Sequence, residues 1–321
     1  MPRLFSTLLL SLMVASSASA VTMAWTPIGN PGNACDPQVQ GCFGAVGHYY
    51  SIGTYEVTNA QYAEFLNAKA ASDPLALYNN SMGSGTGGIT RTGVSGSFSY
   101  SAIAGRGDMP VTLVSFYDAL RFANWMNNGQ GTGDTETGAY TLIGGSPEPT
   151  NGNTVTRNVE ATIFLSSEDE WYKAAYYDAG SASYFDYPTG TNTQTVCAPP
   201  TATSNRANCN AIALGDLTIV GGYPGSPSPY GTFDQGGNVQ EWNEAIINDF
   251  TILRGVRGGR YASSAGSLNG SARSFGIPTQ ESDGSGFRLA MIVPEPGSGL
   301  LVIAGLLGLA GWRREAARRD G

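Results

Sequence analysis

Three segments of the chain carry the same helix-start pattern, and they limit what the chain can fold into. In each, a hydroxyl residue is followed three positions later by an acidic or amide residue that can bond back to it, as in a capping box. The pairs are Thr58 with Gln61, Ser115 with Asp118, and Ser167 with Glu170. Apolar residues then recur at helical spacing, so one face of each helix is expected to pack on a core. These residues are Tyr62, Phe65 and Leu66; Ala119, Phe122, Ala123 and Met126; and Trp171, Ala174 and Ala175.

The remainder of the chain is rich in Gly, Ser, Thr, Asn and Pro, with only short β-like runs. These runs are residues 48–52, 161–165 and 287–292. They are rich in β-branched and aromatic residues, as strands are. Few of them are long enough for a regular sheet to make up most of the domain. We therefore expect a compact α+β domain with much irregular chain.

Both ends of the chain differ from the domain between them. Residues 1–20 combine Arg3, an apolar run and the small-residue end Ala18-Ser19-Ala20, which is the pattern of a signal peptide cleaved after Ala20. Near the other end, an apolar run from Gly297 to Trp312 precedes four arginines. The run is slightly short for a bilayer, so a transmembrane helix here would span with its flanks, and the arginines would mark its cytoplasmic side.

The C-terminal segment, residues 293–321, resembles the PEP-CTERM sorting signal of Gram-negative bacteria. It combines the motif Val293-Pro294-Glu295-Pro296, the apolar span and an arginine-rich end. The resemblance implies processing by an exosortase-type enzyme, and an ordinary single-span anchor is the alternative. Both interpretations predict an exported body in the periplasm, in the cell envelope or at the extracellular surface, anchored at least transiently to the membrane.

The expected mature body is acidic. The chain has 17 basic and 25 acidic residues, and removing the five basic and three acidic residues of the two end segments leaves 12 and 22, a net charge of −10. Such a surface repels nucleic-acid phosphates and attracts divalent cations. We therefore expect no nucleic-acid partner.

The four cysteines predict disulfides, because the chain is expected to be exported. Pairing Cys35 with Cys42 and Cys197 with Cys209 closes short loops at the least cost in chain entropy, although two other pairings are open. Reduced, reactive thiols are the alternative.

Redox-metal sites are hard to build from these residues, whereas a hard-cation site is possible. His48 is the single histidine, but a 2-His-1-carboxylate iron site needs two imidazoles and a catalytic zinc site usually two or three. Asp234, Glu241 and the carbonyls of the Gly236-Gly237 turn could instead supply oxygen ligands to Ca²⁺. The alternative is that both acids only cap turns.

Six sequence blocks follow one another along the body. They are YEVTNAQYAEFLNA (55–68), MPVTLVSFYDALRFANWMN (109–127), FLSSEDEWYKAAYYD (164–178), YGTFDQGGNVQEWNE (230–244), RGVRGGRY (254–261) and GFRLA (286–290). In this order they resemble the formylglycine-generating-enzyme domain, also called the sulfatase-modifying-factor domain. They cover nearly all of the body, so residues 21–292 are identified as one such domain. The resemblance implies a variant of the C-type lectin fold.

The resemblance also implies structural calcium sites. The family's calcium block falls on Asp234, Gly237, Val239 and Glu241, through two side chains and two backbone carbonyls. A second family site falls on Asn208, Cys209, Asp216 and Thr218, where the spacing departs from the family pattern. In both cases the ion would crosslink loops.

The metal chemistry of the family's enzymes is not expected here. Its oxidases carry two closely spaced cysteines after the R-G-G turn and hold copper on their thiolates. In this chain Arg257-Gly258-Gly259 is followed by Tyr261, Ser263, Ser264, Ser267 and Leu268, and a serine hydroxyl is neither soft nor acidic enough to replace a thiolate on Cu(I). Another branch holds iron through histidines of an added helical domain. With one histidine, we expect neither copper nor iron.

We therefore interpret the chain as a non-catalytic, calcium-stabilised binding module. Its ligand, a peptide or an acidic exopolysaccharide, is expected at a cleft lined by Arg257, Arg260, Tyr261 and Ser263. A salt bridge to a neighbouring carboxylate is the alternative role of Arg260. The rival hypothesis is an oxidoreductase of sulfatase maturation, which would oxidise a substrate cysteine to formylglycine at an unrecognised metal site.

Overall fold

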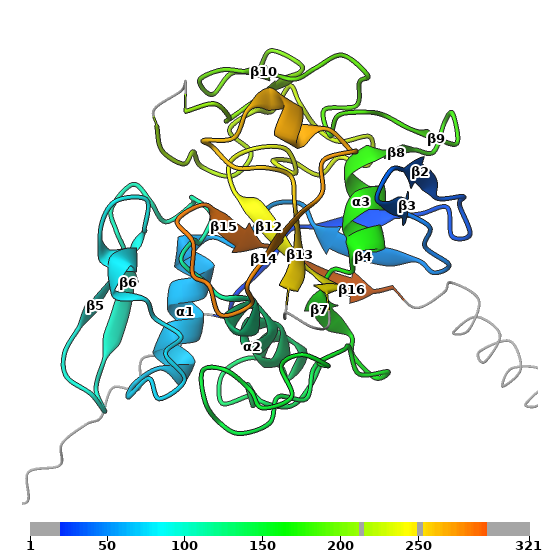
Figure 1. Cartoon of the computed structure of the whole chain (residues 1–321). Coiled ribbons are helices and arrows are strands. Elements are labelled where there is room, and N and C mark those ends of the chain that lie inside the picture. The colour runs from blue at the N-terminus through cyan, green and yellow to red at the C-terminus, as the bar shows by residue number, and fades with distance from the viewer. Residues whose placement is uncertain (1–19, 212–214, 249–252, 294–321) are drawn as a thin grey trace, which may run out of the picture.

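Two four-stranded sheets meet at the centre of the domain in the computed structural model, which describes residues 20–211, 215–248 and 253–293 (Figure 1). The first sheet has the order β1-β4-β16-β7, with strands Trp25–Ile28, Tyr50–Gly53, Leu289–Ile292 and Ile163–Leu165. The second has the order β14-β13-β12-β15, with strands Ser274–Gly276, Leu253–Arg257, Gln240–Asn248 and Ser285–Phe287. Only the β12 and β15 pair within these sheets is parallel.

Four small ribbons and two 3₁₀ turns complete the described structure. The ribbons are β2 (Asp36–Gln38) with β3 (Gly41–Phe43), β5 (Ile89–Thr92) with β6 (Ser99–Ala102), β8 (Tyr177–Asp178) with β9 (Ser183–Tyr184), and β10 (Val196–Cys197) with β11 (Arg206–Ala207). The turns are η1 (Asn80–Gly83) and η2 (Ala265–Leu268). Long irregular segments join these elements, so the structure confirms the prediction of a mixed domain with much irregular chain.

The three predicted helices are present, and each begins with the predicted capping box. They are α1 (Asn59–Lys69), α2 (Phe116–Asn127) and α3 (Glu168–Tyr176). Their aligned apolar residues are buried, as expected. Helix α2 differs from the prediction in being buried around nearly its whole circumference. Irregular chain covers its outer side, where the Arg121 guanidinium bonds the carbonyls of Ser146 and Pro147.

The predicted strand at residues 287–292 is divided between the two sheets. Residues up to Phe287 belong to β15 and residues from Leu289 to β16, with Arg288 between them. Arg288 is the one polar residue in this otherwise apolar run and is itself buried, so periodicity alone does not reveal the division. The runs at residues 48–52 and 161–165 become β4 and β7.

Both disulfides pair as the sequence predicts. Cys35 bonds Cys42 across the β2–β3 hairpin, and Cys197 bonds Cys209 beside β10 and β11. In the described part of the chain, no helix is long and apolar enough to cross a bilayer. The expected membrane span at residues 297–312 and residues 1–19 of the expected signal peptide lie outside the described residues.

The Arg288 side chain, which is fully buried, ties the corner between the sheets to three other parts of the chain. Its Nε and Nη2 donate to the Glu241 carboxylate of β12 at 2.6 and 2.7 Å. Nη1 donates to the carbonyl of Gly53 at 2.9 Å, and Nη2 also reaches the carbonyl of Phe233 at 2.9 Å. Glu241 accepts a further bond from Trp171 Nε1 of α3 at 2.8 Å. One ion pair therefore joins both sheets and a helix.

Replacing Arg288 with methionine should destabilise the fold strongly. The change leaves the buried Glu241 carboxylate without its positively charged partner. Breaking a buried pair in this way costs about 3–5 kcal/mol of unfolding free energy. For a domain of this size the expected fall in Tm is roughly 10 °C. Differential scanning calorimetry would measure it.

The matched control is Arg260→Met, because Arg260 pairs with Asp283 at 2.8 Å but the two side chains are 36% and 52% exposed. An exposed pair of this kind contributes less than about 1 kcal/mol. Equal losses in Tm for the two variants would contradict a central role for Arg288.

Candidate functional site

A cavity of about 330 Å³ lies beside the turn that follows β13. Its lining residues are Gln40, Gln240, Val256, Arg257, Gly258, Gly259, Ser263, Ser267, Ala272, Arg273 and Ser274. The turn requires glycine, since Gly258 has a φ of +94° and a Cβ there would lie 2.7 Å from the Gln235 carbonyl oxygen. A sharp glycine turn thus exposes the following serines to the cavity.

Two of the four residues predicted to line the ligand cleft lie on this cavity. Arg257 and Ser263 do, whereas Arg260 and Tyr261 are not among its lining residues. Arg260 Nη1 donates to Asp283 Oδ1 at 2.8 Å, and the Tyr261 hydroxyl donates to Asp283 Oδ2 at 3.3 Å. The structure therefore shows the salt bridge that was the alternative role for Arg260.

Arg257 is a structural anchor as well as a lining residue. Its side chain is fully buried, and its Nε donates to Glu168 Oε1 at 2.8 Å. Its Nη1 donates to the carbonyls of Gly270 and Ala272 at 3.0 and 2.9 Å. These bonds connect β13 to the first turn of α3 and to the chain before β14.

Arg273 is a cavity residue that the sequence did not indicate. Its Nε donates to Glu168 Oε1 at 2.8 Å and its Nη2 to Glu168 Oε2 at 2.5 Å. The Arg273 side chain is 22% exposed to solvent. Glu168 and Arg273 are 105 positions apart, and no local motif marks Arg273. Only the folded structure brings this pair to the glycine turn.

The cavity presents hydroxyl groups at the positions after the turn. Ser263 Oγ accepts a bond from the backbone N–H of Arg260 at 3.1 Å, and Ser267 Oγ lies 3.4 Å from Ser264 Oγ. All four cysteines of the chain are joined in the two disulfides. The polar groups offered here are therefore hydroxyls, amides and guanidinium groups, which can hydrogen-bond a polar ligand.

The first predicted calcium site contains oxygen donors around a local excess of negative charge. The carboxylates of Glu56, Asp234 and Glu241 interact with one another and share the single arginine Arg288. Burial raises the pKa of Asp234 to about 6, and burial likewise raises the pKa of Glu56. The Oε2 atom of Glu56 is buried without a hydrogen-bond partner. A cation would relieve this repulsion.

The local geometry fits calcium in part. A cavity of about 10 Å³ lies beside Asp234, close to the space one water molecule needs. Gly237 has a φ of +88°, and a Cβ there would lie 2.3 Å from the Asn208 carbonyl oxygen. Against this, Arg288 and Trp171 already bond the Glu241 carboxylate. Within the described residues, no group of three His, Cys, Asp or Glu side chains is placed to hold a metal ion. Backbone carbonyls would therefore have to complete the coordination shell of Ca²⁺.

Residues of the second predicted calcium site converge on Asn238. Its Oδ1 accepts bonds from Asn208 Nδ2 at 3.2 Å and from the Thr218 N–H at 3.0 Å. Asn208 Nδ2 also bonds the Asp216 carbonyl, while Asn208 Oδ1 is buried without a partner. That oxygen is suited to a cation. The Asp216 carboxylate, however, is held by Arg106, whose hydrogen bonds lower the pKa of Asp216.

Cys209, the remaining residue of the second predicted site, has its sulfur in the bond to Cys197. It could therefore offer an ion only its backbone carbonyl.

The fold and this cavity define a loop-rich α+β domain with a polar site at a glycine turn. The chain belongs to the family of the sulfatase-modifying factor enzyme 1-like domain, whose model matches residues 44–293. No curated protein matches the chain in a sequence comparison.

Solved structures are similar to this chain, and the two with TM-scores above 0.5 support the same fold. The crystal structure of CarF is 20% identical, with a TM-score of 0.57, over 85% of this chain and 99% of that one. Variable protein 1 of Treponema denticola is 18% identical, with a TM-score of 0.51, over 87% of this chain and 98% of that one. PvdO from Pseudomonas aeruginosa is 18% identical over 84% and 92% of the two chains, with a TM-score of 0.45. At these identities the likeness concerns the fold.

Without divalent cations, Asp234 should make the domain less stable as pH rises. The folded-state pKa of about 6 exceeds the ordinary value of 3.8, so the folded protein holds this proton more tightly. The resulting contribution to the free energy of unfolding is complete below pH about 4 and is lost as pH rises through about 6.

The variant Asp234→Asn removes this contribution. Its free energy of unfolding in EDTA, measured by urea denaturation, should decline less than that of the wild type between pH 4 and pH 6. Identical pH profiles for the two proteins would contradict the assignment.

Proposed function

We propose that the protein is an exported, envelope-anchored binding module that carries out no oxidation. It would bind a polar ligand, a peptide or an exopolysaccharide, in the cavity beside Gly258 and Gly259. The observation that carries this proposal is the lining of the cavity, where Ser263 and Ser267 follow the turn. Hydroxyl and guanidinium groups favour ligand recognition, whereas hydroxyls are poor ligands for a soft redox metal.

Several features support export and a lectin-like role. Two disulfides favour an oxidising compartment, because cytosolic thiols are kept reduced. The predicted signal peptide and PEP-CTERM-like tail agree with that location. In a C-type-lectin-like fold, loops of variable sequence cover a fixed core, so the ligand can change while the core is kept.

Calcium would stabilise this module. Asp234 and Glu241, with the carbonyls of Gly237 and Val239, would hold one ion; Asn208 Oδ1, with Thr218 and the carbonyls of Cys209 and Asp216, would offer a second, weaker site. The bound ions would neutralise buried carboxylates and crosslink irregular loops. The unpartnered oxygens of Glu56 and Asn208 support this assignment.

Family membership favours a second candidate function, oxidation of a substrate cysteine to formylglycine during sulfatase maturation. This function would require a metal site built from residues other than a thiolate pair, since the four cysteines are in disulfides. Oxidation would also have to consume O₂ in the presence of a cysteine-containing peptide.

Metal analysis and an oxygen electrode should separate the two functions. We expect the purified protein to contain calcium, with copper and iron well below one per chain, and to consume no O₂ with a cysteine-containing peptide. Inductively coupled plasma mass spectrometry gives the metal content. One copper per chain together with peptide-dependent O₂ uptake would establish the oxidase instead.

Removing calcium should lower Tm in a way that added Ca²⁺ reverses. A ligand present at 100 times its Kd stabilises the folded state by about 2.7 kcal/mol, so EDTA should lower Tm by several degrees. The variant Asp234→Asn should show a smaller effect of EDTA. The control Asp283→Asn, which alters an exposed carboxylate paired with Arg260, should respond like the wild type. An unchanged Tm of the wild type in EDTA would count against calcium.

A further inference from the structure

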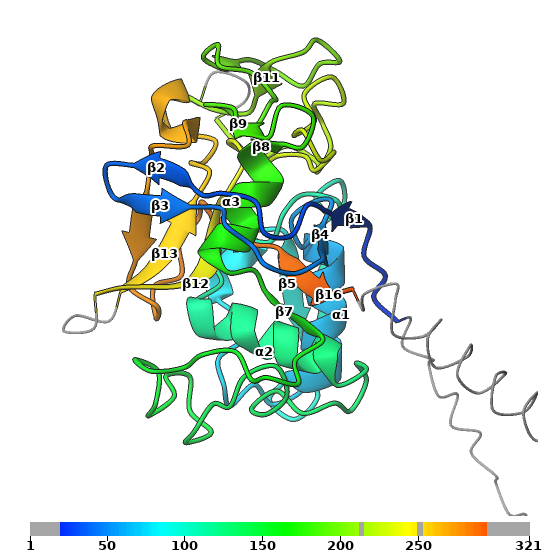
Figure 2. The same cartoon turned by 90° about the vertical axis from the view of Figure 1, so that its right-hand side faces the viewer.

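A short disulfide-closed hairpin lies outside the part of the chain that matches the family. The family model begins at residue 44, whereas β2 and β3 occupy residues 36–43 and are closed by Cys35–Cys42. Figure 2 shows this hairpin beside α3. It therefore lies outside the matched family region, next to the helix that carries Glu168.

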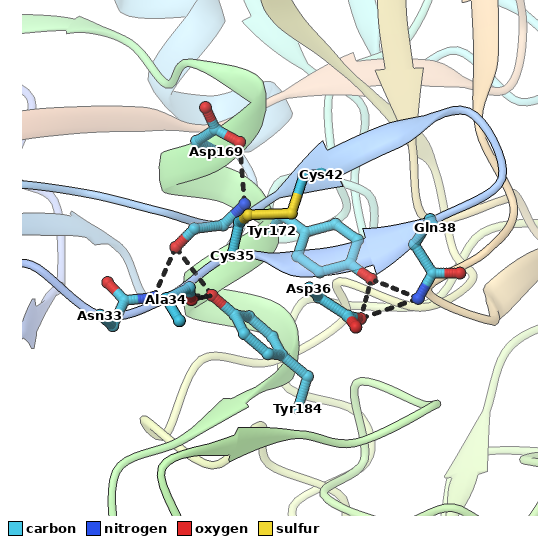
Figure 3. The surroundings of a disulfide bond; sticks show 10 residues. Asn33, Ala34, Cys35, Asp36, Gln38, Cys42, Asp169, Tyr172 and Tyr184 are labelled. Carbon is cyan, nitrogen blue, oxygen red and sulfur yellow. Dashed lines mark hydrogen bonds between the residues drawn. A yellow bond between two sulfur atoms is a disulfide. The ribbon is translucent and has the colours of Figure 1, made fainter.

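The hairpin is fixed to α3 by hydrogen bonds at its base (Figure 3). The Tyr172 hydroxyl donates to Asp36 Oδ2 at 2.7 Å, and the backbone N–H of Gly44 donates to Asp169 Oδ1 at 2.8 Å. The Tyr184 hydroxyl also donates to the Gly44 carbonyl at 2.9 Å. With the disulfide, these bonds hold the hairpin in a defined position.

From this position the hairpin contributes to the cavity beside the glycine turn. Gln40, in its exposed turn, is one of the lining residues. Phe43 lies against both cavity arginines, with its ring centre 4.4 Å from the Arg257 guanidinium carbon and 5.1 Å from that of Arg273. Cation–π contacts of this kind orient guanidinium groups. The hairpin thus forms one wall of the cavity and orients the guanidinium groups of the two arginines.

The charge of the cavity is opposite to that of the whole chain. Arg257 and Arg273 line it, and among the described residues no Asp or Glu is part of the lining. Glu168 behind them supplies one carboxylate for two guanidinium groups, and the hydrogen bonds that Arg273 makes to the described residues use its Nε and Nη2 but not its Nη1. The other large cavity, of about 350 Å³, is lined instead by Glu56, Glu64 and Asp108.

We propose that the hairpin and Arg273 form a binding pocket for an anionic sugar residue. Arg273 would contact a carboxylate on the sugar, and Gln40 with Ser263 would hydrogen-bond its hydroxyls. This inference rests on the proposed binding function and specifies its ligand class. The lining favours a sugar over a peptide, because apart from glycine its only apolar side chains are Val256 and Ala272, too few to hold a peptide's apolar side chains.

The test uses isothermal titration calorimetry on the full chain in mild detergent, with tri-galacturonic acid as the probe and its methyl ester as the neutral counterpart. We expect the acid to bind at least about tenfold more tightly than the ester, since hydrogen bonds to charged groups are the stronger ones. Arg273→Gln should abolish that preference. Raising the salt concentration should weaken binding of the acid more than of the ester.

Matched variants test the contribution of the hairpin to binding. Gln40→Ala should weaken binding of the acid about threefold, as expected for one lost neutral hydrogen bond. Val39→Ala, at the neighbouring and almost fully exposed position of the same turn, should bind as the wild type does. The double variant Cys35→Ser with Cys42→Ser should weaken binding while circular dichroism still shows a folded domain.

Each contrary result has a separate meaning. Equal affinity for acid and ester, or an unaffected Arg273→Gln variant, would overturn the anionic pocket and leave the binding function standing. Binding of a hexaglutamate peptide without binding of either sugar would overturn the sugar class. Binding of neither sugar nor peptide, together with copper and O₂ uptake, would overturn the binding function itself.

Discussion

The rest of the structure depends on the buried pair between Arg288 and Glu241. The guanidinium occupies the corner where β15 ends and β16 begins, and it bonds a carboxylate on β12. Burying two charges is costly, and the cost is offset only when further hydrogen bonds satisfy the remaining donors and acceptors. Here the carbonyls of Gly53 and Phe233 and the indole of Trp171 supply them. Sheet, helix and loop positions are therefore coupled through one polar centre.

Helix α3 carries that coupling from the centre to the cavity. Trp171 faces inward to Glu241, Glu168 at the first turn holds Arg257 and Arg273, and Tyr172 binds the base of the disulfide hairpin. Three neighbouring side chains on one face of this short helix thus connect the two-sheet core, the glycine turn and the disulfide hairpin. A loop-rich cavity can keep a defined shape because its walls are attached to the same helix.

The sequence predicted the features that depend on neighbours in the chain and missed those that depend on distant ones. Capping boxes such as Ser167 with Glu170 act within one helical turn, so all three helices could be located. Both disulfides close short loops and were also predictable. The division of residues 287–292 between two sheets is set by Arg288 and its distant partner Glu241. Arg273 was missed, and the carboxylate that Arg260 meets, Asp283, was not identified, because only tertiary structure brings an arginine to its distant partner.

The glycine turn is held in place by packing and hydrogen bonding within this chain. Position 258 needs glycine because a side chain there would clash with the Gln235 carbonyl. Position 257 needs arginine because its guanidinium bonds Glu168 and two backbone carbonyls. Both requirements come from packing and hydrogen bonding within this chain. Neither involves a thiolate, a metal or a substrate. The turn is therefore a structural feature of this fold in this chain, and what the cavity can bind depends on the serines and arginines that line it.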